Sequence, residues 1–95
     1  MPRRAARTDA NQPEIVAALR AAGCSVASAA ALGGGFPDLV VGRGGRTFLL
    51  EVKDPAKDVT HRALTPAQRT WHDSWRGHVV VVETVEQALA AVGLA

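Results

Sequence analysis

The chain has 95 residues, of which 47% are hydrophobic and 21% are charged, and its net charge is +2. This length has room for one domain, and the composition excludes an intrinsically disordered polypeptide. A single cysteine, Cys24, excludes an internal disulfide and a zinc cluster built on cysteines. No apolar run approaches the roughly 20 residues of a membrane span. We therefore expect a cytoplasmic protein with no membrane partner.

Positive charge is gathered in two parts of the sequence. Residues 1–10 contain Arg3, Arg4 and Arg7, and we expect a flexible basic arm there. A second group lies in the middle of the chain and comprises Arg43, Arg46, Lys53, Lys57 and Arg62. Such groups can bind phosphates electrostatically. A solvated arm without a ligand explains the first group equally well.

The expected domain covers residues 11–95 and begins with a helix. Asn11-Gln12-Pro13-Glu14 predicts a helix start with Asn11 as the N-cap. This helix is expected to end near Ala22, because Gly23 follows. A short, alanine-rich strand is expected over residues 25–30, before the flexible glycines 33–35.

A β-hairpin is the strongest local signal. Residues 38–42 and 47–53 have strand character, and Arg43-Gly44-Gly45-Arg46 lies between them as a turn. A polar loop over residues 54–64 is expected to follow.

The remaining chain predicts a helix, a strand and a last helix. Thr65-Pro66-Ala67-Gln68 begins a helix that is expected to run to Arg76. Residues 78–82 are apolar, which predicts a strand buried on both faces. Thr84 caps a helix that ends near Val92. The order α-β-β-β-α-β-α predicts an α/β fold with a mixed central sheet flanked by helices and a C-terminal helix.

With Gly44 and Gly45 as turn residues, the hairpin places Asp38 opposite Glu51. Opposed residues share a face of the sheet with Cβ atoms about 4.5–5.5 Å apart. Lys53 points the same way and is expected at a solvent-facing strand end. The other face is apolar and is expected to face the core, with Leu39, Val41, Phe48, Leu50 and Val52.

Two acids and a lysine at one strand end favour a cation site. Adjacent carboxylates repel, so one takes up a proton unless a cation joins them. Mg²⁺, with Mn²⁺ as a substitute, accepts one or two carboxylates together with water and phosphate oxygens. Asp38 and Glu51 are the expected metal ligands, and Lys53 would offset developing negative charge. A surface cluster without a function is the alternative.

Gly35-Phe36-Pro37-Asp38 followed by Glu51-Val52-Lys53 resembles the Pro-Asp…Asp/Glu-X-Lys signature of the restriction-endonuclease-like nucleases. Over residues 11–90 the chain is similar to the virus-type replication-repair nuclease (VRR-NUC) domain, a family that includes stand-alone phage proteins. Further features of the match are Leu64-Thr65-Pro66-Ala67-Gln68, Trp71 and the segment 77–82. The resemblance implies a restriction-endonuclease-like αβββαβ core and metal-dependent phosphodiester hydrolysis by Asp38, Glu51 and Lys53.

The resemblance adds two residues to the expected catalytic site. A glutamate on the first helix often joins the site in this family, and Glu14 is the position that fits. Gln68 matches the glutamine that leads the helix after the catalytic strands. Both also complete capping-box patterns, and Thr84-x-x-Gln87 repeats that pattern where no function is suspected. Each residue can act in the site, cap its helix, or do both.

The tryptophans and histidines give little further evidence of function in the sequence. Trp71 and Trp75 share a helix face with Gln68, and we expect them to pack this helix onto the sheet rather than stack on bases. His61, His72 and His78 have no metal-ligand spacing, and we expect ordinary surface residues. A phosphate contact is possible at His61.

The sequence favours a structure-selective DNA endonuclease, with junction, flap or nicking activity, in phage or bacterial replication, recombination or repair. The alternative is a catalytically silent nucleic-acid-binding module on the same fold, and the choice between DNA and RNA stays open. Expected phosphate contacts are Arg3, Arg4, Arg7, Arg43, Lys57, His61 and Arg62. A small core and an apolar C-terminal helix favour a homodimer or larger homo-oligomer, although that helix can instead pack on its own sheet.

Overall fold

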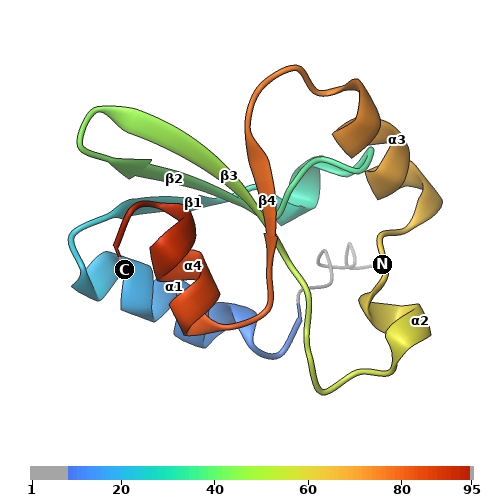
Figure 1. Ribbon diagram of the computed structural model, residues 1–95, viewed down its shortest axis with the longest axis horizontal. Coiled ribbons are helices and arrows are strands. Elements are labelled where there is room, and N and C mark those ends of the chain that lie inside the picture. The colour runs from blue at the N-terminus through green and yellow to red at the C-terminus, as the bar shows by residue number, and fades with distance from the viewer. Residues whose placement is uncertain (1–8, 95) are drawn as a thin grey trace, which may run out of the picture.

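A computed structural model describes residues 9–94, which form a four-stranded mixed sheet flanked by helices (Figure 1). The strands lie in the order β1-β2-β3-β4, and only the β3–β4 pair is parallel. The expected α/β architecture is therefore confirmed. The elements are α1 (Gln12–Ala21), β1 (Ser25–Ser28), η1 (Ala30–Leu32), β2 (Leu39–Arg43), β3 (Arg46–Val52), α2 (Val59–Arg62), α3 (Pro66–Ser74), β4 (Val79–Val82) and α4 (Val85–Ala91).

The core lies on one face of the sheet, beneath α1 and α4 (Figure 1). Strands β2 and β3 turn alternate apolar side chains toward this face, as the sequence predicted. Each fully buried Leu, Ile or Val contributes about 1.5–3 kcal/mol to folding. The buried cluster includes Ile15, Leu19, Leu39, Val41, Leu50, Val52, Val82, Ala88 and Val92.

The hairpin has the predicted register. Val40 pairs with Leu49, and Gly42 pairs with Thr47. Gly44 and Gly45 have φ angles of 57° and 77°, and two positive φ angles are what a type I′ turn requires. This turn fixes which residues of β2 and β3 are opposed, and hence which side chains share a face.

The start of α1 differs from the expected capping box. Asn11 forms no side-chain cap, and its Nδ2 instead donates to the carbonyl oxygens of Lys53 at 3.0 Å and Glu83 at 2.9 Å. These carbonyls directly follow β3 and β4, where the parallel ladder ends and backbone acceptors need new donors. Asn11 therefore ties the first helix to the ends of both strands.

Strand β4 is the edge of the sheet and is not buried on both faces, so that expectation was wrong. Val82 is buried on the core face, but Val81 is 43% exposed. Val81 pairs with Glu51 and shares its face. Helix α3 leaves Val81 uncovered. Apolar composition alone does not distinguish an edge strand from a central one.

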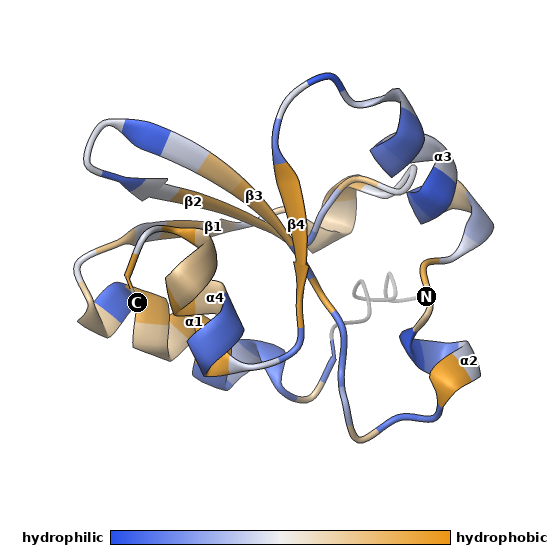
Figure 2. Ribbon diagram, viewed as in Figure 1, coloured by the Kyte–Doolittle hydropathy of each residue, from blue (hydrophilic) through white to orange (hydrophobic). Residues whose placement is uncertain are grey.

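Helix α3 lies on the face opposite α1 and α4 and has no fully buried residue. Much of it is hydrophilic in Figure 2. Trp71 stacks on Trp75 with ring centroids 4.7 Å apart and meets the ring of Phe36 edge-on at 5.2 Å. The tryptophan rings thus pack on each other and on Phe36.

Gly35 brings the segment before Asp38 into backbone contact with α3. Its φ angle is +83°, and a Cβ atom there would collide with the carbonyl group of Ala67. Only glycine allows both this backbone conformation and this approach. The contact sets the position of α3 relative to the segment that carries Asp38.

All helices in the described part of the chain are short, and none of them is both long and apolar enough to cross a bilayer.

Two of the helices were not expected from the sequence. Helix η1 follows β1, and α2 lies in the segment expected as a loop. Helix α2 begins after Asp58, whose carboxylate accepts from the backbone N–H of His61 at 3.0 Å and so caps the helix.

Candidate active site

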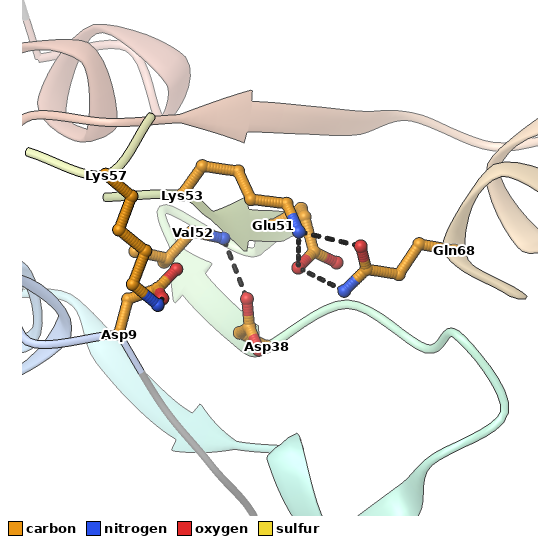
Figure 3. A pocket seen from close by; sticks show the side chains of 7 residues that line it. All are labelled: Asp9, Asp38, Glu51, Val52, Lys53, Lys57 and Gln68. Carbon is orange, nitrogen blue, oxygen red and sulfur yellow. Dashed lines mark hydrogen bonds and ion pairs between the residues drawn. The ribbon is translucent and has the colours of Figure 1, made fainter. Parts of the chain in front are cut away.

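A polar cavity of about 300 Å³ lies at the open end of the β2–β3 hairpin (Figure 3). It brings together four of the five residues expected to be catalytic, namely Asp38, Glu51, Lys53 and Gln68. Asp9, Val52 and Lys57 complete its lining. The side chains come from the segment before β2, from β3 and the residue after it, from the segment between β3 and α2, from α3, and from the residues before α1.

Asp38 is held in place by the backbone of β3. Its Oδ2 accepts a hydrogen bond from the N–H of Val52 at 2.8 Å (Figure 3). Its own carbonyl oxygen accepts from the N–H of Ala29 at 2.8 Å. These bonds extend the sheet by one residue beyond β2 and fix the carboxylate beside Glu51.

Glu51 is a buried acid, with 1% of its surface exposed. Gln68 Nε2 donates to Glu51 Oε2 at 3.1 Å, and Lys53 Nζ lies 3.9 Å from the same oxygen. The other oxygen, Oε1, is buried and has no hydrogen-bond partner among residues 9–94. Burial raises the pKa of Glu51 most, and the hydrogen-bonding Asp38 carboxylate raises it further, to about 9, against a smaller lowering by Lys53.

Lys53 is 7% exposed, so the expectation of a solvent-facing lysine was wrong. Its Nζ donates to Gln68 Oε1 at 2.7 Å. Helix α3 covers the end of β3 at this point and removes the lysine from solvent. A buried ammonium is retained where polar partners offset its desolvation, and here the amide oxygen of Gln68 is one of them.

Gln68 acts in the cavity and also caps α3. The Thr65 hydroxyl accepts from the N–H of Gln68 at 3.2 Å, and Gln68 Oε1 accepts from the N–H of Thr65 at 2.9 Å, which completes a capping box. The same side chain contacts both Glu51 and Lys53. The cap holds the amide in one orientation, with its oxygen toward the lysine and its nitrogen toward the acid.

Asp9 is a residue of the cavity that the sequence did not indicate. Its carboxylate is paired with Lys57 Nζ at 2.6 Å, and its charge contributes to the raised pKa of Glu51. It precedes the expected domain start and belongs to no motif, so no local pattern could have identified it. Lys57, expected as a phosphate contact, lies in the cavity lining itself.

His72 also lies beside the site, although we expected an ordinary surface histidine. Its Nε2 is 3.7 Å from Glu51 Oε1, and both atoms are buried without a hydrogen-bond partner in the described structure. Burial lowers the pKa of His72 most, followed by the charge of Lys53. Because His72 is four residues after Gln68, helical spacing placed both on one face, and this signal could have identified it.

Glu14 does not line this cavity. It is exposed on α1 and lines a separate hollow with Asn11, Asp54 and Glu83. The hydrogen bonds of Asn11 to the strand ends set the rotation of α1 so that Glu14 points away from the cavity. Asp9, which precedes α1, lines the cavity instead.

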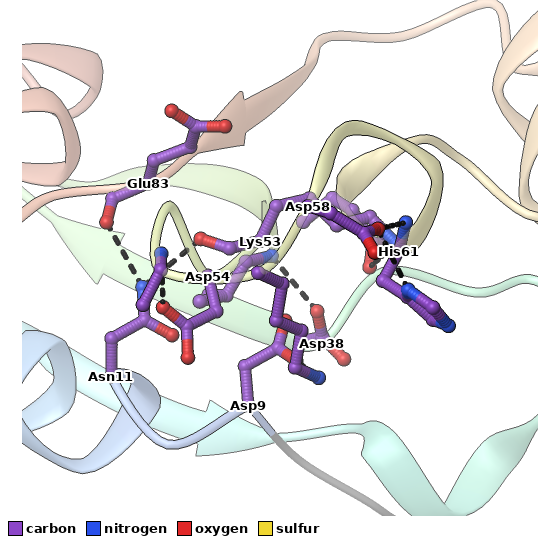
Figure 4. A network of polar contacts seen from close by, with 12 residues as sticks. Asp9, Asn11, Asp38, Lys53, Asp54, Asp58, His61 and Glu83 are labelled. Atoms are coloured by element: carbon purple, nitrogen blue, oxygen red, sulfur yellow. Dashed lines mark hydrogen bonds and ion pairs between the residues drawn. The ribbon is translucent and has the colours of Figure 1, made fainter.

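The expected phosphate contacts are dispersed. Arg43 lies at the hairpin tip, where Nη1 donates to the carbonyl of Val92 at 3.0 Å. His61 Nδ1 pairs with Asp58 at 2.7 Å (Figure 4), and Arg62 lies 3.9 Å from Glu83. Of the four members of this group within residues 9–94, Lys57 alone lines the cavity. Arg3, Arg4 and Arg7 lie outside the described residues.

The donor set of the cavity fits a hard divalent cation. Within residues 9–94 no three His, Cys, Asp or Glu side chains form a preassembled ligand group. Mg²⁺ requires only one or two carboxylates because water and phosphate oxygens complete its shell. Burial and the neighbouring Asp38 favour the protonated form of Glu51 by raising its pKa, and its Oε1 has no hydrogen-bond partner within the described chain. Asp38 and Glu51 are the residues that could hold such an ion in exchange for that proton.

Comparisons with known proteins assign no family: no family model matches the chain, and no curated protein or solved structure matches it either. The inference of function therefore depends on the chemistry of the cavity.

Proposed function

We propose that this protein is a Mg²⁺-dependent nuclease that hydrolyses phosphodiester bonds in the cavity lined by Asp38, Glu51 and Lys53. The observation that carries the proposal is the burial of Glu51 against Asp38, which raises its pKa to about 9. An acid in this state is an unfavourable element of a fold unless a cation is its working partner. Mn²⁺ is the expected substitute for Mg²⁺.

The residues divide the chemistry between them. Asp38 and Glu51 would hold the ion, which when bound supplies an activated water and polarises the phosphate. Lys53 provides a fixed positive charge that offsets the negative charge developing on the phosphate oxygens. Gln68 keeps the lysine and Glu51 at a set separation through its two hydrogen bonds. Positioning of this kind before the reaction lowers the reorganisation needed in the transition state.

The proposed substrate is DNA, and the proposed activity is structure-selective endonuclease cleavage (junction, flap or nicking activity) in the cytoplasm of a bacterial or phage-infected cell. The resemblance to VRR-NUC domains and the restriction-endonuclease-like core that it implies support this choice. A catalytically silent nucleic-acid-binding module is the alternative. Asp38, Glu51 and Lys53 are all present and line one cavity, and this intact set favours the enzyme.

The proposed working unit is a homodimer formed through β4. This strand is an apolar sheet edge, and unpaired edges can pair with another chain. A hollow of about 420 Å³ beside it is lined by Val80, Val81, Val82, Gln87, Ala90 and Ala91. Antiparallel pairing of two β4 strands about a two-fold axis would place both cavities on the same face of one continuous sheet. Two strands of a duplex or junction could then be cut.

Self-association is measured by sedimentation or light scattering at micromolar concentration. We expect a dimer for the unmodified protein and a monomer for Val81→Lys, because a charge on the edge blocks strand pairing. Val59→Lys, on the exposed surface of α2, is the matched control and should stay dimeric. An active monomer of 9.9 kDa would contradict the dimer.

The nuclease is tested with labelled duplex, single-stranded, flap and four-way-junction DNA in Mg²⁺, Mn²⁺ or EDTA. We expect no cleavage in EDTA, cleavage with either metal, and no cleavage by Asp38→Asn. Glu86→Gln removes an exposed acid outside the cavity and should cleave normally. Undiminished cutting by metal-stripped protein would exclude the mechanism. Binding without cutting in any metal would favour the silent module.

A further inference from the structure

Three aromatic side chains form a row on the α3 side of the molecule: Phe36, Trp71 and Trp75, which we call the aromatic row. Phe36 meets the edge of Trp71, and Trp71 stacks on Trp75 at an interplanar angle of 20°. None of the three is buried in the core, and Trp75 is 42% exposed. A chain with four aromatic residues thus keeps three of them outside its core.

The aromatic row is continuous with the candidate active site. Phe36 is two residues before Asp38, on the segment that Gly35 holds against α3. Trp71 lies one helical turn after Gln68, and His72 beside it faces Glu51. The backbone elements that carry the row are therefore the same ones that carry the cavity. His72 links the two, because its ring lies edge-on to Trp71 with centroids 5.8 Å apart and its Nε2 lies 3.7 Å from Glu51 Oε1.

A positive charge lies next to the row. Arg76 directly follows Trp75 and is exposed. Arg76 forms no ion pair with any residue in the described part of the chain. Aromatic rings beside an unpaired cation are typical of surfaces that bind single-stranded nucleic acid, where the rings stack on bases and the cations contact phosphates.

We propose that the aromatic row stacks on an unpaired base of the strand whose phosphate enters the cavity. This inference rests on the proposed function insofar as the ligand is a nucleic acid. Within a continuous duplex each base face is covered by its neighbours, so a protein ring can stack only on a base at an end, a flap or a single strand. The protein therefore prefers single-stranded or splayed segments to a continuous duplex. Trp75, the most exposed ring of the row, is the specificity-determining residue.

Binding is measured in EDTA, so that no cleavage occurs, by fluorescence anisotropy of labelled DNA. The probes are an oligothymidine of about 12 nucleotides, within the range that one single-strand-binding module contacts, and a covalently closed circular duplex, which has no ends. Trp75→Ala should weaken binding of the single strand by about 5- to 100-fold, the usual effect of losing one stacked ring. Its effect on the duplex should stay under about twofold. Trp75→Phe should retain most of the affinity, and Val59→Ala, which removes an exposed apolar group outside the row, should change neither.

Intrinsic tryptophan emission of the unmodified protein gives a readout that does not depend on the stability of any variant. Stacking should quench this emission on addition of oligothymidine but not of duplex. Absence of preferential quenching would overturn the inference, as would an equal loss of affinity for both probes in a folded Trp75→Ala. A change in self-association alone would overturn it too, because it would assign the row to a protein contact.

The two proposals fail in different ways. Binding of single strands through Trp75 without cleavage in Mg²⁺ would contradict the nuclease and leave the stacking surface intact. Mg²⁺-dependent cleavage with no preference for unpaired bases would overturn the stacking surface alone.

Discussion

The side-chain amide of Gln68 donates to the carboxylate of Glu51 across 3.1 Å and so joins α3 to β3. Its oxygen accepts from Lys53 at 2.7 Å. The amide therefore acts as a spacer between an acid and a base that would otherwise approach each other directly, and Lys53 Nζ remains 3.9 Å from Glu51 Oε2. A lysine held off its carboxylate partner keeps its charge for a ligand in the cavity.

The first prediction separates the site role of Gln68 from its cap. Gln68→Ala should lower turnover by about 10- to 100-fold, as is usual when a residue that orients a ligating side chain is removed. Gln87→Ala is the matched control, because Gln87 occupies the same position in the helix start after Thr84 and contacts no site residue. Both variants should lose about 1 kcal/mol of stability. Equal turnover of the two variants would show that Gln68 only caps α3.

The second prediction concerns the pH dependence of stability in EDTA. The pKa of Glu51 is raised from 4.5 to about 9 in the folded protein, so folding favours the protonated acid. Its contribution is fully present below pH 4.5 and is lost as the pH rises toward 9. Urea midpoints should therefore fall over this window. Glu51→Gln should remove this fall, and Glu86→Gln, on an exposed acid, should preserve it. An unmodified protein with flat midpoints would contradict the raised pKa.

The third prediction follows from the burial of Lys53. Lys53→Ala should abolish turnover and also cost about 1–3 kcal/mol, because the amide oxygen of Gln68 loses a buried donor. Lys53→Met retains the length of the aliphatic stem, so it should restore part of the packing without restoring turnover. Urea unfolding and a cleavage assay on both variants give the comparison. Activity in Lys53→Met would show that the ammonium is dispensable.

The fourth prediction identifies which acid near the first helix belongs to the site. Asp9→Asn should weaken Mg²⁺ binding, measured by calorimetry, because it removes a negative charge from the cavity lining. Glu14→Gln should leave it unchanged, since Glu14 lines a different hollow. Weaker Mg²⁺ binding by Glu14→Gln, with no change for Asp9→Asn, would show that Glu14 and not Asp9 belongs to the site.

The hairpin could be predicted from the sequence because all of its determinants are local. A turn with two glycines and an alternating apolar face admit one register, and that register places Asp38 beside Glu51 with Lys53 on the same face. The geometry of the three central residues therefore followed from fifteen or so consecutive positions, about the length of chain that a hairpin needs.

Other parts depend on contacts between distant segments, and local patterns could not supply them. Asn11 has the sequence of an N-cap, but it donates to carbonyls 42 and 72 residues away. That tertiary contact overrides the local preference and sets the rotation of α1, on which the place of Glu14 depends. The burial of Lys53 likewise depends on where α3 lies, which strand patterns do not specify.

Gly35 has a consequence for comparing this protein with others. A methyl group at that position would push the carbonyl of Ala67 away, and Gln68, the next residue, would move with it. The amide would then no longer reach Glu51, although every acid, lysine and glutamine of the site would still stand in the sequence at its proper spacing. A search for the polar motif residues alone would score the site of such a protein as complete. The hydrogen atom that serves as the side chain of Gly35 is thus as diagnostic of this site as any of its charged groups.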